Sequence, residues 1–201
     1  MPFFYVLYIH DSPLSDYLEA IRFLADPGEK AAAHITVRGP YLRAISLKHI
    51  QKSLVGERIA ISSVGNFFSD GQKTVFWNCS SPRLESVWKK KDFGFHPHIT
   101  AYDGLSLHFA RDLYEVMRQY PYELQFEARQ LQIYSSRKRQ TGFQLQLFYN
   151  ENLICRILNR DLTARQITRL SPRKRLYYID RICKYISRHS LSEKPAQLLF
   201  A

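Results

Sequence analysis

The pattern of apolar and polar positions predicts strands and helices in a nearly regular succession. Short apolar runs rich in β-branched and aromatic residues predict strands, and apolar residues that recur every three or four positions predict helices. The predicted strands are 3–10, 34–41, two within 58–80, 95–102, and a hairpin formed by 122–136 and 141–150. The predicted helices lie within 12–28, 46–56, 81–91 and 106–120.

The order of these elements up to residue 150 is β-α-β-α-β-β-α-β-α-β-β. Its second half repeats the helix, His-bearing strand, helix and hairpin of the first. This repeat favours an α+β fold over a doubly wound parallel sheet. We therefore expect a bilobal, duplicated α+β fold, in which two mostly antiparallel sheets flank a central groove and the helices lie outside. No Gly-rich phosphate loop or dinucleotide fingerprint is present.

The sequence pattern changes after about residue 160 and becomes helical and basic. A helical pattern begins there, with an apolar face of Leu176, Ile179, Ile182 and Ile186. Basic residues occupy the rest of that helix: Arg173, Lys174, Arg175, Arg181, Lys184 and Arg188. We expect one domain over 1–158 and a basic helical C-terminal extension over 159–201. The extension is either a helix pair docked on the domain with a solvated basic face, or an arm that contacts nucleic acid.

The charge of the chain favours a polyanionic partner. The 201 residues carry a formal net charge of +11, and a strongly basic protein attracts nucleic acid first among polyanions. The three cysteines are widely spaced and form no Cys-x-x-Cys motif, which suits a reducing, cytoplasmic setting. The apolar N-terminal run is interpreted as a strand rather than a signal peptide, and no run is long enough to span a membrane.

A short motif occurs twice, in two predicted strands. His34-Ile35-Thr36 reappears 64 positions later as His98-Ile99-Thr100. A third His-x-Ser, at 10–12, lacks the apolar middle residue and is interpreted as a chance match. Side chains alternate along a strand, so one face of each motif strand is polar and the other apolar. The expected polar faces are His34, Thr36 and Arg38 on the first strand, and His96, His98, Thr100 and Tyr102 on the second.

Two imidazoles across a groove suit paired acid and base catalysis near neutral pH. A phosphodiester needs this division, since one group activates a nucleophile and the other protonates the departing oxygen. Hydroxyls of Thr36 and Thr100 can donate to the phosphate oxygens, and Arg38 can add a bidentate contact. Tyr41 and Tyr102 are candidates for stacking on a base. No metal is required, and the sequence offers no obvious acidic cluster that would hold one.

The motif-bearing segments "HITVRGPY" (34–41) and "PHITAYDG" (97–104) resemble the two signatures of the 2H phosphoesterase superfamily. That superfamily includes RNA 2′,5′-ligase-like proteins and cyclic phosphodiesterases. The resemblance covers about residues 1–150 and implies a bilobal α+β fold with one motif per lobe. It implies that His34 and His98 are catalytic, and that Thr36 and Thr100 bind phosphate.

The expected function is metal-independent cleavage, or reversible formation, of phosphodiester bonds. The substrates implied by the resemblance are RNA ends, 2′,3′-cyclic phosphates, 2′,5′-linked oligonucleotides or cyclic nucleotides, with no cofactor. Two alternatives stay open. One is a module on the same fold that binds RNA or a cyclic nucleotide without turning it over. The other is a metal-dependent hydrolase built on His96 and His98, because His-x-His on a strand points both rings the same way.

Overall fold

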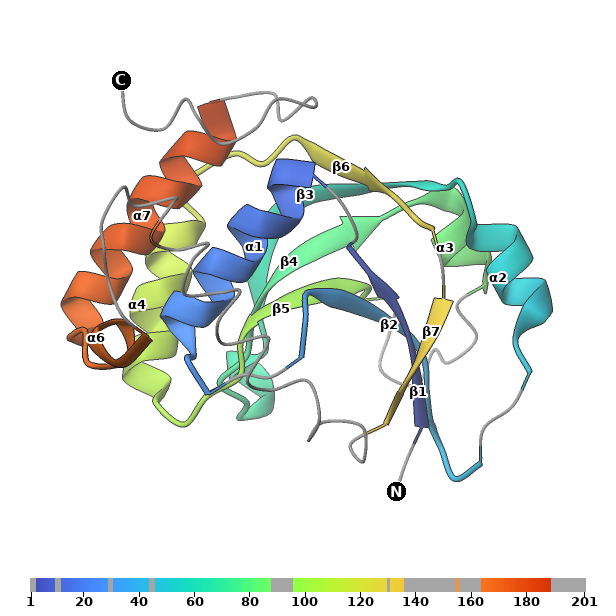
Figure 1. Cartoon of the computed structure of the whole chain (residues 1–201), viewed down its shortest axis with the longest axis horizontal. Helices are drawn as coiled ribbons and strands as arrows, with labels where there is room; N and C mark the ends of the chain where they lie inside the picture. The colour runs from blue at the N-terminus through green and yellow to red at the C-terminus, as the bar shows by residue number, and fades with distance from the viewer. Residues whose placement is uncertain are drawn as a thin grey trace.

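The computed structural model describes residues 3–9, 12–28, 31–43, 46–87, 96–129, 131–135, 155 and 164–188. Its centre is a curled antiparallel sheet of seven strands with helices packed around it, an α+β fold (Figure 1). The strands are β1 (Phe3–Tyr8), β2 (His34–Tyr41), β3 (Arg58–Asn66), β4 (Val75–Ser80), β5 (His98–Tyr102), β6 (Leu124–Glu127) and β7 (Leu131–Ser135).

The helices are α1 (Ser12–Ala25), α2 (Lys48–Leu54), η1 (Phe68–Asp70), α3 (Pro82–Val87), α4 (Leu107–Met117), α6 (Ala164–Thr168) and α7 (Pro172–Arg188). Helices α1 to α4 lie within the ranges expected from the sequence, although residues 88–91 of the predicted helix 81–91 lie outside the described residues. Ser106 caps α4 with its side chain, which accepts from the Phe109 N–H at 3.2 Å. The connection between β3 and β4 contains η1 and then Gly71, whose φ of 72° favours glycine.

The strands form one sheet, whereas the sequence predicted two. Their order is β6-β3-β4-β5-β2-β1-β7, so the two motif strands β5 and β2 are neighbours at its centre. Ile35 pairs with Ile99 there, and this pair joins the half β7-β1-β2 to the half β5-β4-β3-β6. Sequence patterns define which face of a strand is apolar but not which strand lies beside it, which is why this union was not foreseen.

The segment predicted as one hairpin strand, 122–136, is divided between the two edges of the sheet. Its first part, β6, pairs with β3, and its second part, β7, pairs with β1. The break comes at Ala128, which exchanges backbone hydrogen bonds with Glu57 and Gly56, each of 2.8 Å. Because only 128–130 separate β6 from β7, the sheet must curl until its edges approach each other. The second predicted hairpin strand, 141–150, lies outside the described residues.

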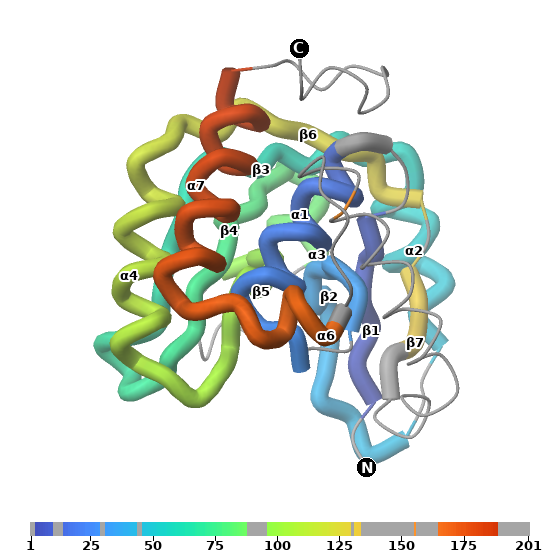
Figure 2. Tube along the Cα trace, turned by 60° about the vertical axis from the view of Figure 1, so that its left-hand side comes forward, coloured from blue at the N-terminus to red at the C-terminus, as the bar shows by residue number. Residues whose placement is uncertain are grey.

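Helices α1, α4 and α7 lie together on one side of the sheet (Figures 1 and 2). Helix α7 packs on both α1 and α4. Its buried side chains are Tyr178, Ile179, Ile182, Cys183 and Ile186. The ring of Tyr185 lies 5.3 Å from that of Tyr17 in α1, and Asp180 accepts from the Tyr120 hydroxyl at 2.6 Å. The predicted basic helix is thus docked on the fold, while the predicted boundary at 158/159 lies outside the described residues.

None of the helices that the structure describes combines the length and the apolar content needed to cross a membrane.

Candidate active site

The pairing of Ile35 with Ile99 brings the two motifs side by side. Both isoleucines are fully buried in the core. Because neighbours along a strand alternate faces, the residues that flank them lie on the opposite face of the sheet. These four half-buried residues are His34, Thr36, His98 and Thr100. The structure therefore brings together the four residues that the sequence proposed as the centre of the site.

The antiparallel register also orders this quartet. Because β2 and β5 run antiparallel, the residue before Ile35 lies opposite the residue after Ile99, so His34 lies opposite Thr100. In the same way, Thr36 lies opposite His98. Side chains directly opposed across an antiparallel pair have Cβ atoms about 4.5–5.5 Å apart. Each imidazole thus faces a hydroxyl from the other motif, and the two imidazoles lie on a diagonal.

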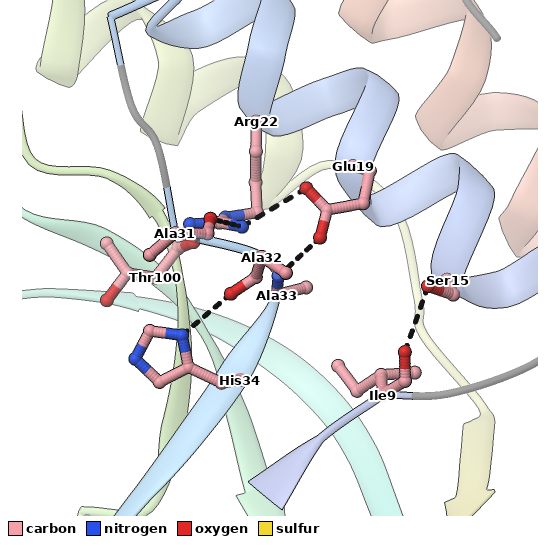
Figure 3. Close-up of polar contacts among 9 residues, drawn as sticks. All are labelled: Ile9, Ser15, Glu19, Arg22, Ala31, Ala32, Ala33, His34 and Thr100. Carbon is pink, nitrogen blue, oxygen red and sulfur yellow. Dashed lines mark hydrogen bonds and ion pairs between the residues drawn. The ribbon is translucent and has the colours of Figure 1, made fainter. Parts of the chain in front are cut away.

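Both histidines have the same tautomer, set by the same kind of contact. His34 Nδ1 lies 2.7 Å from the carbonyl oxygen of Ala32 (Figure 3), and His98 Nδ1 lies 2.6 Å from that of His96. A carbonyl oxygen only accepts hydrogen bonds, so each Nδ1 carries the proton and donates it. The proton-accepting nitrogen of each neutral ring is therefore Nε2.

The contact to residue i−2 also explains why position 96 differs from its counterpart at 32. The hydrogen bond to the imidazole uses only the backbone carbonyl of this residue, which both His96 and Ala32 supply. The His96 side chain is exposed, and its ring lies 6.3 Å from that of Phe67. Among the residues that the structure describes, no three His, Cys, Asp or Glu side chains are grouped as a metal site.

A register shift follows each motif. In β2 the pairing with β1 shifts between Thr36 and Arg38, and Arg38 comes to pair with Tyr5. In β5 the pairing with β4 shifts between Thr100 and Tyr102. An extra residue in one strand of a pair disrupts the regular alternation of side chains. The alternation that placed Arg38 and Tyr102 beside the threonines therefore does not hold at these positions.

Arg38 is buried, with 7% of its surface exposed. Its Nη1 donates to the Val37 carbonyl at 3.1 Å, whereas its Nη2 has no hydrogen-bond partner. Burial lowers the pKa of this guanidinium below its usual value. An unpaired buried guanidinium nitrogen is costly, and an anion would relieve that cost. The role of Arg38 as a phosphate ligand stays a prediction.

The two tyrosines proposed for base stacking occupy different environments. Tyr102 is 6% exposed, its hydroxyl accepts from the Ser106 N–H at 3.0 Å, and its ring lies 5.3 Å from that of Phe109. These contacts hold it in the core beside α4, which gives no support for stacking on a base. Tyr41 is half-buried, with its ring edge-on to Tyr5 at 5.9 Å, and its stacking role stays a prediction.

Aromatic rings surround the imidazole of His98. Phe76 lies 4.8 Å and Phe67 5.4 Å from it, measured between ring centroids, and the two phenyl rings are 4.4 Å apart. The Phe76 ring lies so close over Gly65 that an added Cβ would be 2.5 Å from it. This apolar enclosure is the main reason why the pKa of His98 is below its usual value. His98 is therefore neutral at pH 7, with Nε2 able to accept a proton.

A buried ion pair in α1 holds the backbone on which both motifs depend (Figure 3). Arg22 Nη1 lies 3.2 Å from a carboxylate oxygen of Glu19. The guanidinium also donates to the carbonyls of Ala31 at 2.7 Å and Thr100 at 2.8 Å. The other Glu19 oxygen accepts from the Ala33 N–H. One helix thus fixes the residues just before the first histidine and the backbone of the second motif.

Sequence reasoning missed this pair, the two phenyl rings around His98 and the amide opposite it. The missed residues are Glu19, Arg22, Phe67, Phe76 and Asn78. A signal for the ion pair was present, because "YLEAIRFLA" (17–25) is apolar on every side except at Glu19 and Arg22. Charges on a helix that is otherwise buried must be paired. For the others no signal existed, since their role depends on the neighbouring strand.

This arrangement carries the groups that acid–base chemistry on a phosphate uses. Two Nε2 atoms on one face can accept and donate protons, and two threonine hydroxyls on the same face can donate to an anion. Asn78 lies on β4 opposite His98, and its Nδ2 donates to the Ser63 hydroxyl at 2.9 Å. This pair adds further polar atoms to the face. The face therefore combines a reactive quartet with hydrogen-bonding and aromatic groups on its β3–β4 side.

A comparison of the chain with models of known protein families found no match, and a comparison with curated protein sequences found none either.

We predict that Glu19→Gln lowers the free energy of unfolding of the protein and disturbs the backbone of both motifs. The glutamine still accepts from the Ala33 N–H, but it leaves the Arg22 charge buried without a counter-charge. Breaking a buried pair in this way costs about 3–5 kcal/mol in the free energy of unfolding, to be measured by urea denaturation. The amide chemical shifts of His34 and Thr100 should change as well, since both motifs lose part of their anchor.

Glu115→Gln is the matched control, because Glu115 and Arg118 form the same i,i+3 pair on α4 but exposed to solvent. Its unfolding transition should stay close to that of the wild type. Equal stability of the two variants would contradict an anchoring role for the Glu19–Arg22 pair.

We also predict that His98 titrates below the usual histidine pKa of about 6.5, and that Phe67→Ala raises its pKa. Removing the phenyl ring admits water, which favours the charged imidazolium. An NMR titration of the imidazole carbons measures this directly. Phe68→Ala is the control, because the Phe68 ring lies beside Tyr114 rather than His98. A His98 pKa that Phe67→Ala leaves unchanged would show that the aromatic enclosure does not set it.

Proposed function

We propose that this protein is a metal-independent phosphodiesterase of the 2H type that acts on RNA or nucleotide substrates. The observation that carries the proposal is the quartet of His34, Thr36, His98 and Thr100 on one face of the sheet, with both imidazoles fixed through Nδ1. This tautomer leaves Nε2 of each ring for proton transfer. A phosphodiester between two such rings meets a base, an acid and two hydroxyl donors at once.

In the proposed reaction, His98 is the base and His34 is the acid. Enclosure by Phe67 and Phe76 keeps His98 neutral, so its Nε2 accepts the proton of an attacking water. The water oxygen forms a bond to phosphorus, and the bond from phosphorus to the departing ribose oxygen breaks. His34, entering as imidazolium, gives its Nε2 proton to that oxygen. The hydroxyls of Thr36 and Thr100 donate to the non-bridging oxygens, where charge accumulates.

The surroundings of the quartet support a nucleotide rather than a simple phosphate ester. On the β3–β4 side, the amide of Asn78 and the hydroxyl of Ser63 offer hydrogen bonds, and the half-buried ring of Phe67 offers a surface for stacking. The substrate classes are RNA ends, 2′,3′-cyclic phosphates, 2′,5′-linked oligonucleotides and cyclic nucleotides. All contain a phosphodiester attached to a base and a sugar.

We further propose that the two halves of the domain arose by duplication, as the resemblance to the 2H phosphoesterase superfamily implies. Three features repeat in support of it. Each histidine donates to the carbonyl two residues before it, and each motif is followed by a register shift. The residue just before each histidine also accepts a backbone hydrogen bond from a neighbouring segment. The Ala33 carbonyl accepts from the Ile9 N–H, and the Pro97 carbonyl accepts from the Cys79 N–H. In this proposal, β1-α1-β2 corresponds to β4-α3-β5, and the basic segment 159–201 is an addition.

We predict that His34→Ala and His98→Ala each reduce turnover by about 10²–10⁴-fold, because each removes one proton-transfer group. Turnover is measured on a 2′,3′-cyclic nucleotide, a 2′,5′-linked dinucleotide and a cyclic dinucleotide, with products identified by mass. Addition of EDTA should leave the rate unchanged. His108→Ala is the control, since its ring is exposed on α4 and pairs with Asp112.

Undiminished turnover in the His34→Ala/His98→Ala double variant would overturn this mechanism. Binding of these ligands without any product would favour the alternative of a non-catalytic binding module. Loss of activity with EDTA, restored by a divalent cation, would favour a metal-dependent hydrolase.

A further inference from the structure

The outward face of α7 is a continuous basic stripe. At about 100° per residue of helix, six exposed side chains fall within an arc of about 100°. Around the helix they follow one another as Arg173, Lys184, Tyr177, Arg188, Arg181 and Lys174. Five of the six are cations and the sixth is a tyrosine. We call these six residues the α7 stripe.

Among the residues that the structure describes on α7, no carboxylate falls within the arc of the stripe. The one acidic residue of α7, Asp180, lies at the edge of the arc and accepts a hydrogen bond of 2.6 Å from the Tyr120 hydroxyl. Arg165 and Arg169, at α6 and just beyond it, are exposed as well and extend the positive charge past the N-terminal end of α7. Positive potential therefore accumulates along one side of this helix pair.

The opposite face of α7 is already occupied by the core. Its apolar side chains, with Ile179 and Ile182 almost fully buried, pack toward α1 and α4. The helix thus has no apolar face left to insert into a lipid surface, which a membrane-bound amphipathic helix requires. Its free surface is cationic, with one aromatic ring, Tyr177, exposed to 55%. Cations that follow a phosphate backbone, combined with an aromatic that stacks on a base, are typical of single-stranded nucleic acid binding.

We propose that the α7 stripe binds a strand of RNA, with the cations on its phosphates and Tyr177 against a base. From Arg173 to Arg188 the stripe is about 22 Å long. A stacked strand at about 3.4 Å per nucleotide places roughly six phosphates along that length. The five cations of the stripe are therefore close in number to the phosphates that lie along it.

This RNA surface is separate from the candidate active site. Helix α7 packs on α1 and α4, on the helical side of the sheet (Figure 2), whereas His34 and His98 are on the opposite face from the core isoleucines. Binding at the stripe does not depend on the chemistry proposed for the quartet. If both hold, the stripe retains a long RNA while one of its ends or linkages reaches the quartet.

The test is fluorescence anisotropy with a labelled, unstructured oligo-uridine, titrated with the full chain over about 50–200 mM salt. Arg181→Gln/Lys184→Gln should weaken binding about tenfold near physiological salt, and should reduce the slope of log K against log salt by about 1.4, since each lost phosphate contact contributes about 0.7. Lys48→Gln/Lys52→Gln is the matched control. It makes the same change in net charge on α2, where both lysines are exposed, and should leave affinity and slope near wild type.

Tyr177→Ala separates stacking from charge. It should weaken binding by about fivefold to a hundredfold with the salt slope unchanged. Circular dichroism of each variant checks that the helices are intact, which the exposure of all substituted side chains favours.

Equal loss of affinity in the α2 and α7 double variants would overturn the proposal, because net charge alone would then explain binding. So would an oligo-uridine affinity that none of these variants alters. Tighter binding to vesicles of phosphatidylcholine and phosphatidylserine than to RNA, abolished by Arg181→Gln/Lys184→Gln, would assign the stripe to a membrane surface instead. Each of these measurements is a binding affinity and is independent of turnover. The RNA-binding proposal can therefore be tested even if the phosphodiesterase proposal fails.

Discussion

The buried ion pair between Glu19 and Arg22 is the constraint on which the site depends. A charge this deep in the core is tolerated only when its hydrogen bonds are satisfied. Glu19 binds Arg22 and the Ala33 N–H, while Arg22 binds the carbonyl of Ala31, just before β2, and that of Thr100 in β5. The need to satisfy these groups ties α1 to both motif strands. The face that carries the two histidines and two threonines is therefore positioned from the helical side of the sheet, through the backbone rather than through their side chains.

Backbone contacts also orient the two histidines. Each imidazole is oriented by the carbonyl two residues before it, so no further side chain is needed to select the tautomer. Aromatic rings lie beside both imidazoles. The Tyr8 ring is edge-on to His34 at 5.8 Å, while Phe67 and Phe76 enclose His98, whose pKa is lowered by burial. A neutral imidazole whose Nδ1 carries the proton accepts a further proton at Nε2, which is what a general base requires.

The charged side chains of α7 lie on the face of the helix that does not contact the rest of the fold. On α7, apolar residues face α1 and α4, and the cations that remain are gathered on the outward arc. An amphipathic helix that docks by its apolar face must leave its polar face in water. The prediction that 159–201 contains a docked basic helix and the prediction that it contacts nucleic acid are therefore compatible. Docking is what concentrates the cations on one side.

The sequence by itself determined strands β1 to β5 and helices α1 to α4 as far as the structure describes them, and the α+β class. It also pointed to His34, Thr36, His98 and Thr100, whose roles stay predictions. Apolar periodicity and a repeated motif are local properties, so they can be read along the chain. Only the tertiary structure decided that β2 and β5 join the strands into one sheet, that 122–136 is divided between its edges, and that Tyr102 is buried. Those outcomes depend on which strand lies beside which, and on register shifts that interrupt alternation, neither of which a single strand encodes.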